Sequence, residues 1–515
     1  MRLSDLLDAL PKELAVLEST STDSARLQII RGIRYDSRQI SPGDLFVALR
    51  GANSDGHHFI ECAVQSGAAA LLVEEMPEAA LRAEVPAFVV PDCRRALAPL
   101  AEAFFGQPAD ELTLIGVTGT NGKTSTTYIV ESILTQAGKR TGLVGTVEVR
   151  YAGEREVAVN TTPESLDLQR MLRSMVNAHV DATVMEVSSH GLELGRVSGC
   201  RFKVAAFTNL SQDHLDFHGS MDAYLASKSR LFRDHLAPNA TAVINIDDSA
   251  SEKMIDIARE TGAQILTVGR GEDSQADLRL ISSEVGLNGT QALLEDQAGR
   301  IEIELPLLGD FNLENLLVAV GIARALGIDS ETIARGVALC PQVPGRMERV
   351  VGTGISEPTV LVDYAHTPDA VDKLLSAVRP LCKGRLIAVF GCGGDRDRAK
   401  RPLMAQAVTR HADIAIATSD NPRTEDPASI LLDVEAGLAG LVKVDADRLF
   451  SSNGQFAAML DRRQAIETAI LGADPTDTVV LAGKGHEDYQ IIGREKFPFD
   501  DRLEARRVLI DRGAR

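Results

Sequence analysis

The sequence predicts an α/β protein with three domains: a smaller N-terminal α/β domain, a central domain built on a parallel sheet, and a C-terminal doubly wound domain. Three observations predict this fold class. The 515 residues exceed what one ordinary hydrophobic core supports. Short β-branched runs alternate with helical stretches, and polar, glycine-rich segments directly follow many of the apolar runs.

The apolar runs form three series that define the domains. The first hundred residues hold the shorter runs IRYDS, LFVAL, AALLV and AFVV among Gly, Pro and Asp turns. The second series is LTLIGV, ATVMEV, VAAFTNL and TAVINI, and the third is TVLVDYA, LIAVFGC, DIAIATS and TVVLAGK. Proline interrupts helical continuation near Pro108 and from Pro341 to Pro344. We therefore expect domains at residues 1–107, 108–340 and 341–515, the last with a Rossmann-like sheet.

Bulk composition narrows the class of protein. A formal charge of −19 disfavours non-specific binding to nucleic acid or membranes, because their phosphates repel such a surface. Asp5 and Asp8 interrupt any N-terminal apolar core, and no later apolar run approaches the roughly 18 residues that span a bilayer. The six cysteines lack C-x-x-C spacing, which suits a reducing compartment. We expect a cytoplasmic protein and, without repeats or interaction tails, a monomer.

The segment TGTNGKTSTT, residues 118–127, follows an apolar run and opens a helical stretch. Gly119 and Gly122 allow backbone N–H groups to turn around an anion, Lys123 supplies a point charge, and Thr124 offers a hydroxyl to Mg²⁺. Val117 stands where the common phosphate-loop pattern has its first glycine, so a simple turn before a helix is the alternative. The order of strand, loop, Lys-Thr and helix favours a P-loop that binds ATP.

Further polar residues follow later strands of the central series. Glu186 ends one apolar run and His214 lies in the loop after the next, so both are candidate Mg²⁺ ligands at the same sheet edge. The alternatives are a surface acid and a solvent-facing histidine. Lys228 lies within an expected helix, where a solvated face is the ordinary interpretation. Asn312 and Asn315 open another helix, where one is expected to cap the backbone and the other to reach a nucleotide base or phosphate; capping alone is the ordinary interpretation.

The C-terminal series has a proline-stiffened loop, SDNPRTED, at the end of a strand. Arg423 matches a carboxylate in bidentate fashion, while Asp420 and Glu487 are suited to an ammonium, so this loop predicts an amino-acid site. An Asn-Pro turn capped by its own side chains is the alternative. Arg346 and Asp363, near the second boundary, are candidates for nucleotide contacts.

Taken in order, these motifs resemble the Mur ligase family of peptidoglycan assembly over nearly the whole chain. The motifs are TGTNGKT, EVSSHGL, TNLSQDHLDFHG, FNLEN, PGRMER, DYAHTPD, GCGGDRD, DNPR and GKGHED. The resemblance implies an ATP-dependent amide ligase that adds meso-diaminopimelate to UDP-N-acetylmuramoyl-L-alanyl-D-glutamate through an acyl phosphate. It also implies ATP and Mg²⁺ as cofactors and only small molecules as partners.

The resemblance assigns site residues to three ligands. For ATP they are Gly119, Thr120, Asn121, Gly122, Lys123, Thr124, Asn312, Asn315, Arg346 and Asp363, and for the metal Thr124, Glu186, His214 and Lys228 as a carbamate. For the UDP-muramoyl dipeptide they are Tyr35, Ser37, Asn53, Ser54, Asn160, Thr161, Thr162, Ser188, Leu194 and Arg196. For diaminopimelate they are Arg396, Asp420, Asn421, Pro422, Arg423, Gly483 and Glu487. The catalytic set is Lys123, Glu186, His214 and Lys228.

Two details bear on substrate choice. Leu194 stands where many relatives have glutamine, which puts one contact to the peptide or phosphate in doubt. A buried Arg423 left without a second ligand carboxylate is expected to disfavour L-lysine by roughly 3 to 5 kcal/mol. A lysine-adding ligase, a folylpolyglutamate-type synthetase and a nucleotide-dependent regulator that senses a cell-wall precursor are the competing hypotheses.

Overall fold

The structure is a computed structural model that describes all residues except 21–22, 52–53, 79–84, 272–273, 353–355 and 514–515. The chain divides into two compact units, which are described separately. The first comprises residues 1–279, 295–299 and 315–336, and the second comprises 280–294, 300–314 and 337–515. None of the helices in the described part of the chain combines the length and apolar composition that crossing a bilayer requires.

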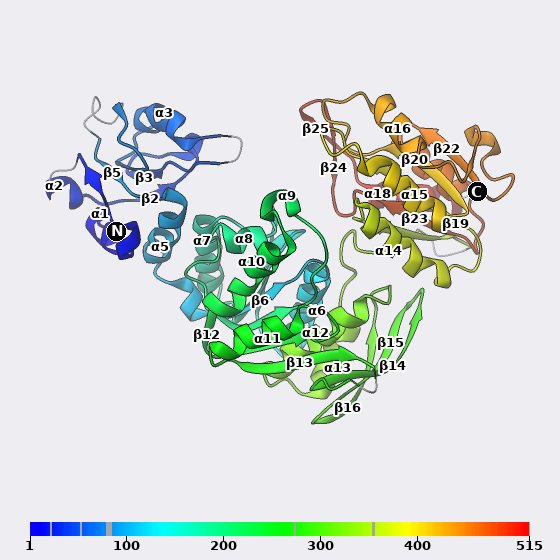
Figure 1. Cartoon of the computed structure of the whole chain (residues 1–515), viewed down its shortest axis with the longest axis horizontal. Coiled ribbons are helices and arrows are strands. Elements are labelled where there is room, and N and C mark those ends of the chain that lie inside the picture. Colours follow the sequence, from blue (N-terminus) through cyan, green and yellow to red (C-terminus); the bar gives the residue numbers. More distant parts are fainter. Residues whose placement is uncertain (21–22, 52–53, 79–84, 272–273, 353–355, 514–515) are drawn as a thin grey trace. The chain divides into compact units, whose positions relative to one another are not determined.

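The first hundred residues form a five-stranded sheet in the order β1-β5-β4-β3-β2, with β2 to β5 parallel and β1 antiparallel (Figure 1). One face packs on α1 and α5 and the other on α3, because consecutive strand residues alternate between the two cores. The strands are β1 Glu18–Ser19, β2 Gly32–Arg34, β3 Asp44–Val47, β4 Ala70–Val73 and β5 Ala87–Val89. The helices are α1 Leu3–Asp8, α2 Asp23–Arg26, α3 Ile60–Gln65 and α5 Cys93–Phe105, with short 3-10 turns at Lys12–Leu14, Ser37–Gln39 and Gly56–Phe59.

The rest of the first unit is built on a larger sheet that contains the neighbouring strands β13-β12-β11-β6-β10-β7-β8-β9. Strands β13 to β7 in this order are parallel, and β8 and β9 continue as an antiparallel meander that the sequence analysis did not predict. Its strands are β6 Thr113–Thr118, β7 Thr141–Val144, β8 Glu148–Tyr151, β9 Glu154–Val157, β10 Ala182–Glu186, β11 Phe202–Phe207, β12 Leu236–Asn245 and β13 Gln264–Arg270.

The helices that follow these strands are α6 Lys123–Gln136, α7 Ser165–Asn177, α8 Ser189–Glu193, α9 Leu215–His218, α10 Met221–Asp234 and α11 Ser251–Glu260, after a 3-10 turn at Pro108–Glu111. Further along the chain come β14 Leu278–Gly286, β15 Gly289–Asp296, β16 Gly299–Leu305, α12 Asn312–Ala325 and α13 Ser330–Ala338. The three strands β14 to β16 also lie outside the predicted series of apolar runs.

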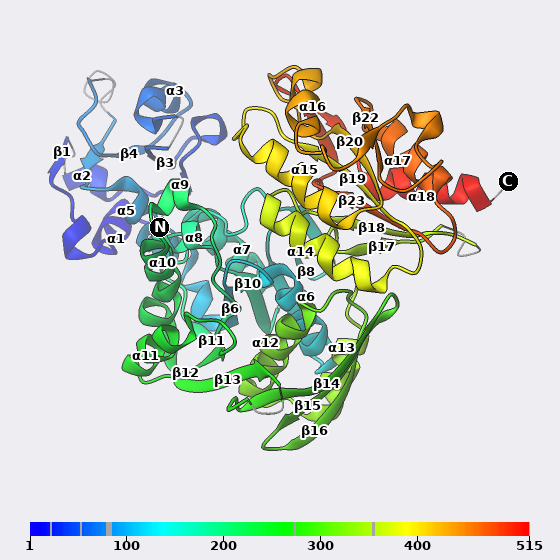
Figure 2. The same cartoon turned by 45° about the vertical axis from the view of Figure 1, so that its right-hand side comes forward.

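The second unit contains a seven-stranded sheet in the order β17-β18-β23-β19-β20-β22-β21. All its pairs are parallel except β17 with β18. Helices α14, α15 and α16 share the core of one face, and α17 and α18 that of the other (Figure 2). This is the doubly wound arrangement that the sequence predicts, so the α/β class is confirmed.

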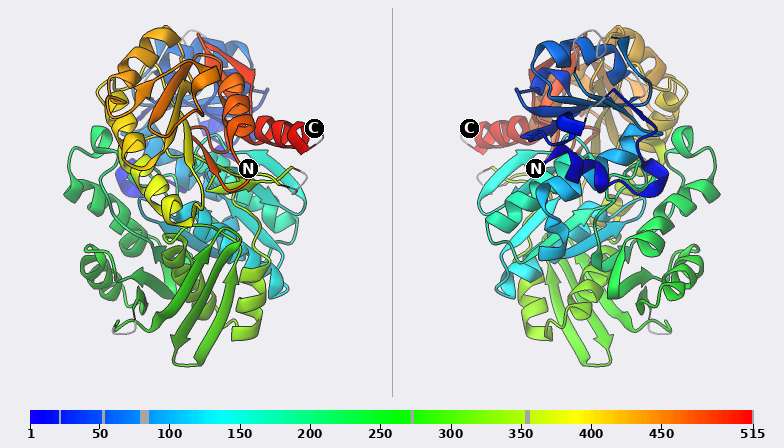
Figure 3. Two further views of the ribbon diagram at one scale, coloured as in Figure 1. Left: turned by 90° about the vertical axis from the view of Figure 1, so that its right-hand side faces the viewer. Right: turned by 90° about the vertical axis from the view of Figure 1, so that its left-hand side faces the viewer.

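The strands of this sheet are β17 Glu348–Val350, β18 Thr359–Asp363, β19 Leu386–Cys392, β20 Ile414–Ser419, β21 Val442–Lys443, β22 Gln455–Met459 and β23 Thr478–Ala482. Its helices are α14 Pro368–Val378, α15 Lys400–His411, α16 Pro427–Glu435, α17 Arg462–Gly472 and α18 Asp501–Gly513, with 3-10 turns at Arg379–Leu381 and Ala446–Arg448. A hairpin of β24 Tyr489–Ile492 and β25 Glu495–Pro498 precedes α18, which extends beyond the sheet to the C-terminus (Figure 3).

Candidate functional site

The predicted phosphate loop lies between β6 and α6 in the first unit. Gly119 and Gly122 have φ of +150° and +86°, values that residues other than glycine rarely adopt. The Lys123 ammonium folds back and donates to the carbonyl oxygens of Gly119 and Thr120 at 2.9 and 2.8 Å. Thr124 is buried in the first turn of α6. The loop thus leads into the N-terminus of α6, a position that favours an anion, while the N–H groups of Thr120 and Asn121 donate to Asn209.

Tertiary contacts hold this loop. Thr208 Oγ1 donates to the carbonyl of Asn121 at 2.6 Å, and the Asn121 N–H donates to Asn209 Oδ1 at 2.9 Å. The side chain of Asn315 lies against Gly122, where a Cβ would stand 2.0 Å from Asn315 Oδ1. Asn315 is therefore placed beside the phosphate loop. Asn312 is buried and donates to the Leu308 carbonyl at 2.6 Å.

Glu186 ends β10 and is 1% exposed, which excludes the surface-acid alternative. Its two carboxylate oxygens accept from the Thr146 N–H at 2.8 Å and the Thr146 hydroxyl at 2.9 Å. His214 follows β11 with a left-handed φ of +52° and a half-exposed side chain. Burial lowers the pKa of His214 and Asp213 opposes this shift, while the nearby Lys123 and Lys228 lower it further.

Lys228 in α10 is 1% exposed, so the solvated-face interpretation is wrong. Its amine donates to the Gly119 carbonyl at 2.7 Å and lies 4.3 Å from the centre of the Tyr224 ring. Burial, and then the positive charge of Lys123, hold the pKa of Lys228 well below its usual value. The lowered pKa favours the neutral, nucleophilic form of this amine, which α10 places against the Gly119 carbonyl of the phosphate loop.

An imidazole cluster next to this lysine was not predicted. The rings of His190 and His214 are 4.8 Å apart, and those of His190 and His218 are 5.5 Å apart. Burial lowers the pKa of His190 to about 4, and the neighbouring His214 and His218 contribute. Both segments carry motifs, SSHG and HLDFHG, but only the fold shows that their histidines meet.

A cavity of about 470 Å³ in the first unit is lined by two of the residues predicted to bind the UDP-muramoyl dipeptide. Tyr35 and Asn160 line it, together with the unpredicted Glu164, Asp167 and Arg170. The Tyr35 hydroxyl donates to Asp167 at 2.5 Å, and burial followed by this bond raises the pKa of Tyr35. The cavity joins the N-terminal sheet to α7, a pairing that no single motif reveals.

Three of the remaining peptide-site candidates, Thr162, Ser188 and Arg196, lie close to Glu164 or to one another. Glu164 accepts hydrogen bonds from Arg94 and Arg196, and Arg196 also donates to the Thr162 carbonyl at 3.1 Å. The hydroxyl groups of Thr162 and Ser188 form a hydrogen bond of 3.1 Å. Those of Thr161 and Thr146 form one of 3.0 Å. Leu194 is the C-cap residue of α8. Ser37 begins a 3-10 turn, Ser54 is exposed, and Asn53 lies outside the described residues.

The second unit carries the candidates Arg346 and Asp363. Asp363 ends β18, and its carboxylate accepts from the backbone N–H groups of Met347 and Ala365, both at 2.8 Å. Burial raises the pKa of Asp363, and Arg346 opposes that shift. The Arg346 guanidinium lies 5.0 Å from the centre of the Tyr364 ring, and its Nε atom has no hydrogen-bond partner within the described chain.

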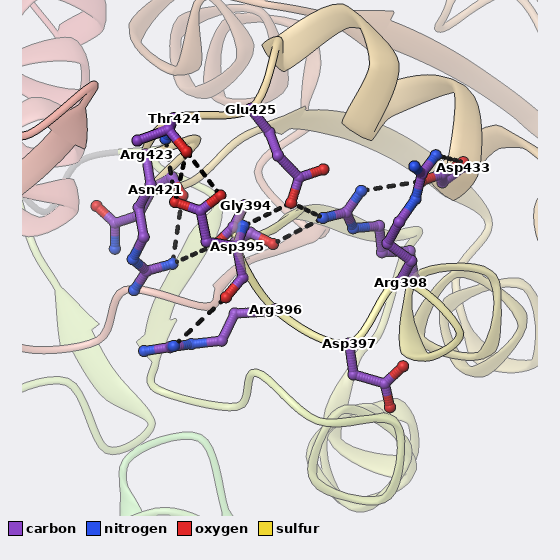
Figure 4. Close-up of polar contacts among 12 residues, drawn as sticks. Gly394, Asp395, Arg396, Asp397, Arg398, Asn421, Arg423, Thr424, Glu425 and Asp433 are labelled. Carbon is purple, nitrogen blue, oxygen red and sulfur yellow. Dashed lines mark hydrogen bonds and ion pairs between the residues drawn. The ribbon is translucent and has the colours of Figure 1, made fainter. Parts of the chain in front are cut away.

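The predicted amino-acid loop follows β20 and lies against the loop after β19 (Figure 4). Arg423 donates to the Gly394 carbonyl at 2.8 Å, and a Cβ at Gly393 would stand 2.8 Å from Arg423 Nη1 and 3.7 Å from Arg396 Cγ. The two arginines therefore lie beside the same glycine. Arg423 is half-buried rather than buried, so the expected penalty for an unpaired buried charge was too large.

A network of charged residues ties the two loops together. Asp395 accepts from the Thr424 hydroxyl at 2.9 Å, and its own N–H donates to Glu425 at 2.5 Å. Arg401, 1% exposed, donates to Glu425 at 2.7 Å and to Asp433 at 2.9 Å. These contacts were not predicted, because charged residues in a loop carry no sequence signal for their partners.

Lys484, which the sequence did not single out, lies beside the residues predicted to bind an ammonium group. Asn421 donates to Glu487 Oε2 at 2.9 Å and accepts from the Ile491 N–H at 2.9 Å, so the loop is not a turn capped by its own side chains. The Lys484 ammonium is fully buried and lies 3.5 Å from Asp420 Oδ1 and 3.3 Å from Glu487 Oε2. Gly483 has a φ of +117°, and a Cβ at this position would stand 3.9 Å from the Asp420 carboxylate.

No three His, Cys, Asp or Glu side chains gather into a metal-binding group within the described ranges. The candidate donors are instead the Thr124 hydroxyl at the start of α6, the Glu186 carboxylate at the end of β10 and the His214 imidazole in the segment after β11. Such a sparse set fits Mg²⁺, which retains phosphate and water ligands, better than a fully protein-bound metal.

Comparisons with known proteins agree with the order of these sites. Three family models match: "Mur ligase family, catalytic domain" over residues 29–105, "Mur ligase middle domain" over 117–323 and "Mur ligase, glutamate ligase domain" over 345–485. A phosphate loop on a parallel sheet followed by a doubly wound unit is thus the architecture of an enzyme class, and the chain belongs to the Mur ligase family.

Individual relatives narrow the similarity further. The chain is 46% identical to a UDP-N-acetylmuramoyl-L-alanyl-D-glutamate--2,6-diaminopimelate ligase of Synechococcus elongatus, covering 99% of both sequences. It is 47% identical to the ligase of the same name from Geobacillus thermodenitrificans, over 94% of this chain and 95% of that one. A solved structure of a ligase with this name superposes with a TM-score of 0.68 at 35% identity, covering 100% and 99% of the two chains. The MurF ligase of Thermotoga maritima, solved in complex with ADP, shares the fold at 18% identity and a TM-score of 0.63, over 96% and 99% of the two chains.

Proposed function

We propose that the protein is an ATP-dependent amide ligase that adds meso-diaminopimelate to UDP-N-acetylmuramoyl-L-alanyl-D-glutamate during peptidoglycan precursor synthesis. The observation that carries this proposal is the full-length similarity to ligases of that name, combined with a phosphate loop and a two-arginine loop at strand ends. The L-lysine ligase, the folate enzyme and the regulator remain the rivals that the assay below separates.

The reaction joins a carboxylate to an amine, which needs activation because a carboxylate is a poor electrophile. The ATP γ-phosphoryl group passes to the side-chain carboxylate of D-glutamate, giving an acyl phosphate and ADP. A free amine of diaminopimelate attacks the acyl carbon, loses a proton, and expels phosphate from the tetrahedral intermediate. Lys123 offsets charge on the transferring group, and water exclusion protects the acyl phosphate.

The residues around the phosphate loop would hold ATP and Mg²⁺ in this reaction. Bound Mg²⁺ would supply charge neutralisation for the phosphates, with Thr124, Glu186, His214 and Lys228 as its nearest protein groups. Gly119, Thr120, Asn121 and Gly122 are proposed to face the phosphates, and the side chain of Asn315 lies against Gly122. Asn312, Arg346 and Asp363 are proposed for the nucleotide on the resemblance alone.

Lys228 is proposed to act as a carbamate. Burial lowers the pKa of Lys228, which favours the neutral form of its amine, and that form attacks carbon dioxide to give a carboxylate-like carbamate with release of a proton. The test compares the variants Lys228→Glu and Lys228→Ala and measures intact mass under carbon dioxide. Equal activity of the two variants, together with an unmodified amine, would refute the carbamate.

The two substrate sites follow the described contacts. The cavity lined by Tyr35 and Asn160 is proposed for the UDP-muramoyl dipeptide. On the resemblance alone, the same ligand is assigned the further residues Ser37, Asn53, Ser54, Thr161, Thr162, Ser188, Leu194 and Arg196. Because Glu164 and the Thr162 carbonyl hold Arg196, its position does not depend on the side chain at Leu194. Arg396, Pro422 and Arg423 are proposed for the far carboxylate of diaminopimelate, and Asp420, Asn421, Gly483 and Glu487 for its ammonium.

Phosphate release with meso-diaminopimelate and L-lysine side by side tests the function. We expect release only when ATP, the muramoyl dipeptide and the amino acid are all present. L-lysine lacks the second carboxylate, and the loss of one charge-assisted contact to a half-buried arginine predicts a preference of about 10- to 100-fold. Equal rates with L-lysine would favour the lysine ligase, and hydrolysis indifferent to both additions would favour the regulator.

Three further assignments are part of the proposal. We expect domain limits at 1–107, 108–340 and 341–515, a monomer in solution, and action in the cytoplasm. Limited proteolysis with mass analysis tests the limits, sedimentation tests the monomer, and fractionation of cells tests the compartment.

A further inference from the structure

The proposed amino-acid site contains a buried lysine, Lys484. Lys484 follows β23 and is fully buried, whereas His486 and Glu487 in the same loop are partly exposed. The turn Lys484–Glu487 is closed by a hydrogen bond from the Glu487 N–H to the Lys484 carbonyl at 2.9 Å. A lysine with no exposed surface is uncommon and requires charged or polar partners.

Three side-chain oxygens surround the Lys484 ammonium. They are Glu487 Oε2 at 3.3 Å, Asn421 Oδ1 at 3.4 Å and Asp420 Oδ1 at 3.5 Å. All three belong to residues proposed to receive the ammonium of diaminopimelate. Asp420 Oδ1 is buried and makes no hydrogen bond within the described chain, so Lys484 is its charged neighbour.

The charges on these groups do not cancel. Two carboxylates and one ammonium leave one net negative charge, which matches a single incoming ammonium group. Without Lys484 the two carboxylates would repel each other, and Glu487, which is partly exposed, would turn toward water. Asn421 would then lose both its charged partners, because it bonds to Glu487 and Lys484.

We infer that Lys484 is a positioning residue that holds Asp420, Asn421 and Glu487 in place and sets the charge of the amino-acid site for one ammonium group. This inference rests on the proposed function, since it assigns a role within the site for diaminopimelate. Because Lys484 is assigned to binding of the amino acid and not to phosphoryl transfer, its replacement should change the KM for diaminopimelate.

The experiment measures phosphate release by the full chain with ATP, the muramoyl dipeptide and meso-diaminopimelate. The variants are K484M, which removes the charge, K484R, which keeps it, and the control K496M. Lys496 is an exposed lysine whose ammonium lies 3.9 Å from the Tyr489 ring, whereas that of Lys484 lies 5.7 Å from the same ring. If K484M does not fold, K484Q replaces it.

For K484M we expect the KM for diaminopimelate to rise about 10- to 100-fold, the loss of one or two charge-assisted contacts. The KM for ATP and the kcat at saturation should stay within about threefold of the wild-type values, because Lys484 supports binding of the amino acid equally in the ground state and the transition state. K484R should lie nearer to the wild type than K484M, and K496M should match the wild type.

A double-mutant cycle with D420N separates this role from simple packing. Loss of both charges restores one net negative charge, so the KM of K484M/D420N should lie well below the product of the two single effects. Multiplicative effects, or a K484M change confined to thermal stability, would overturn the inference. An inactive wild type would instead refute the proposed function, which makes the two failures distinguishable.

Discussion

Replacement of Arg401 by methionine tests whether the buried guanidinium holds the two loops of the amino-acid site. Arg401 is 1% exposed and donates to Glu425 at 2.7 Å and to Asp433 at 2.9 Å. Each charge-assisted hydrogen bond contributes about 1.5 to 3 kcal/mol, but both carboxylates are a quarter exposed and gain water when the arginine is lost. We therefore expect R401M to lower the free energy of unfolding by about 2 to 4 kcal/mol.

Arg398 provides a matched control, because it binds the same Asp433 carboxylate at 3.1 Å but is 66% exposed. Exposed ion pairs contribute about 0 to 1 kcal/mol, so R398M should change stability little. Urea unfolding followed by circular dichroism is the assay, since the chain has no tryptophan. The KM for diaminopimelate should rise in R401M only, because Glu425 holds Asp395 and hence the arginine-bearing loops.

The pH dependence adds a second readout. The side-chain hydrogen bond from Arg401 is the first cause that lowers the pKa of Glu425 below its usual 4.5. A depressed carboxyl pKa contributes stability above the unfolded value, and this contribution is lost as the pH falls through the folded value. The gap between wild type and R401M should therefore narrow below pH 4.5. Equal stability of R401M and R398M at neutral pH would refute the reasoning.

Three other substitutions test the two units. G122A should raise the KM for ATP by at least about tenfold, because a Cβ would stand 2.0 Å from Asn315 Oδ1. The control G138A, at a glycine that also has a positive φ but open space around it, should lower the free energy of unfolding by only about 1 kcal/mol. R462M should destabilise the second unit by about 3 to 5 kcal/mol in urea unfolding, since it strips a fully buried carboxylate of its partner, and a loss under 1 kcal/mol would contradict this. Burial lowers the pKa of His235 to about 4, so below pH 6.5 this histidine binds a proton in the unfolded chain but not in the folded one. The free energy of unfolding should therefore fall by about 3 kcal/mol between pH 6.5 and 4, and acid titrations of H235Q should lack this decrease.

Contiguous features were predictable from the sequence. The phosphate loop, with Lys123 and Thr124, occupies one short segment whose strand, turn and helix are all local. The DNPR loop and the doubly wound series were predictable for the same reason, because β-branched runs and the turns after them report their own conformation. The family followed from the order of such segments along the chain.

Contacts between distant segments were decided only by the tertiary structure. Lys228 resembles a solvated helical lysine until α10 packs its amine against Gly119, more than a hundred residues earlier. Lys484 meets Asp420 because β19 brings the ends of β20 and β23 to one edge. Sequence patterns encode burial and backbone geometry through short-range periodicity, whereas the partner of a buried charge depends on which strand ends become neighbours when the sheet assembles.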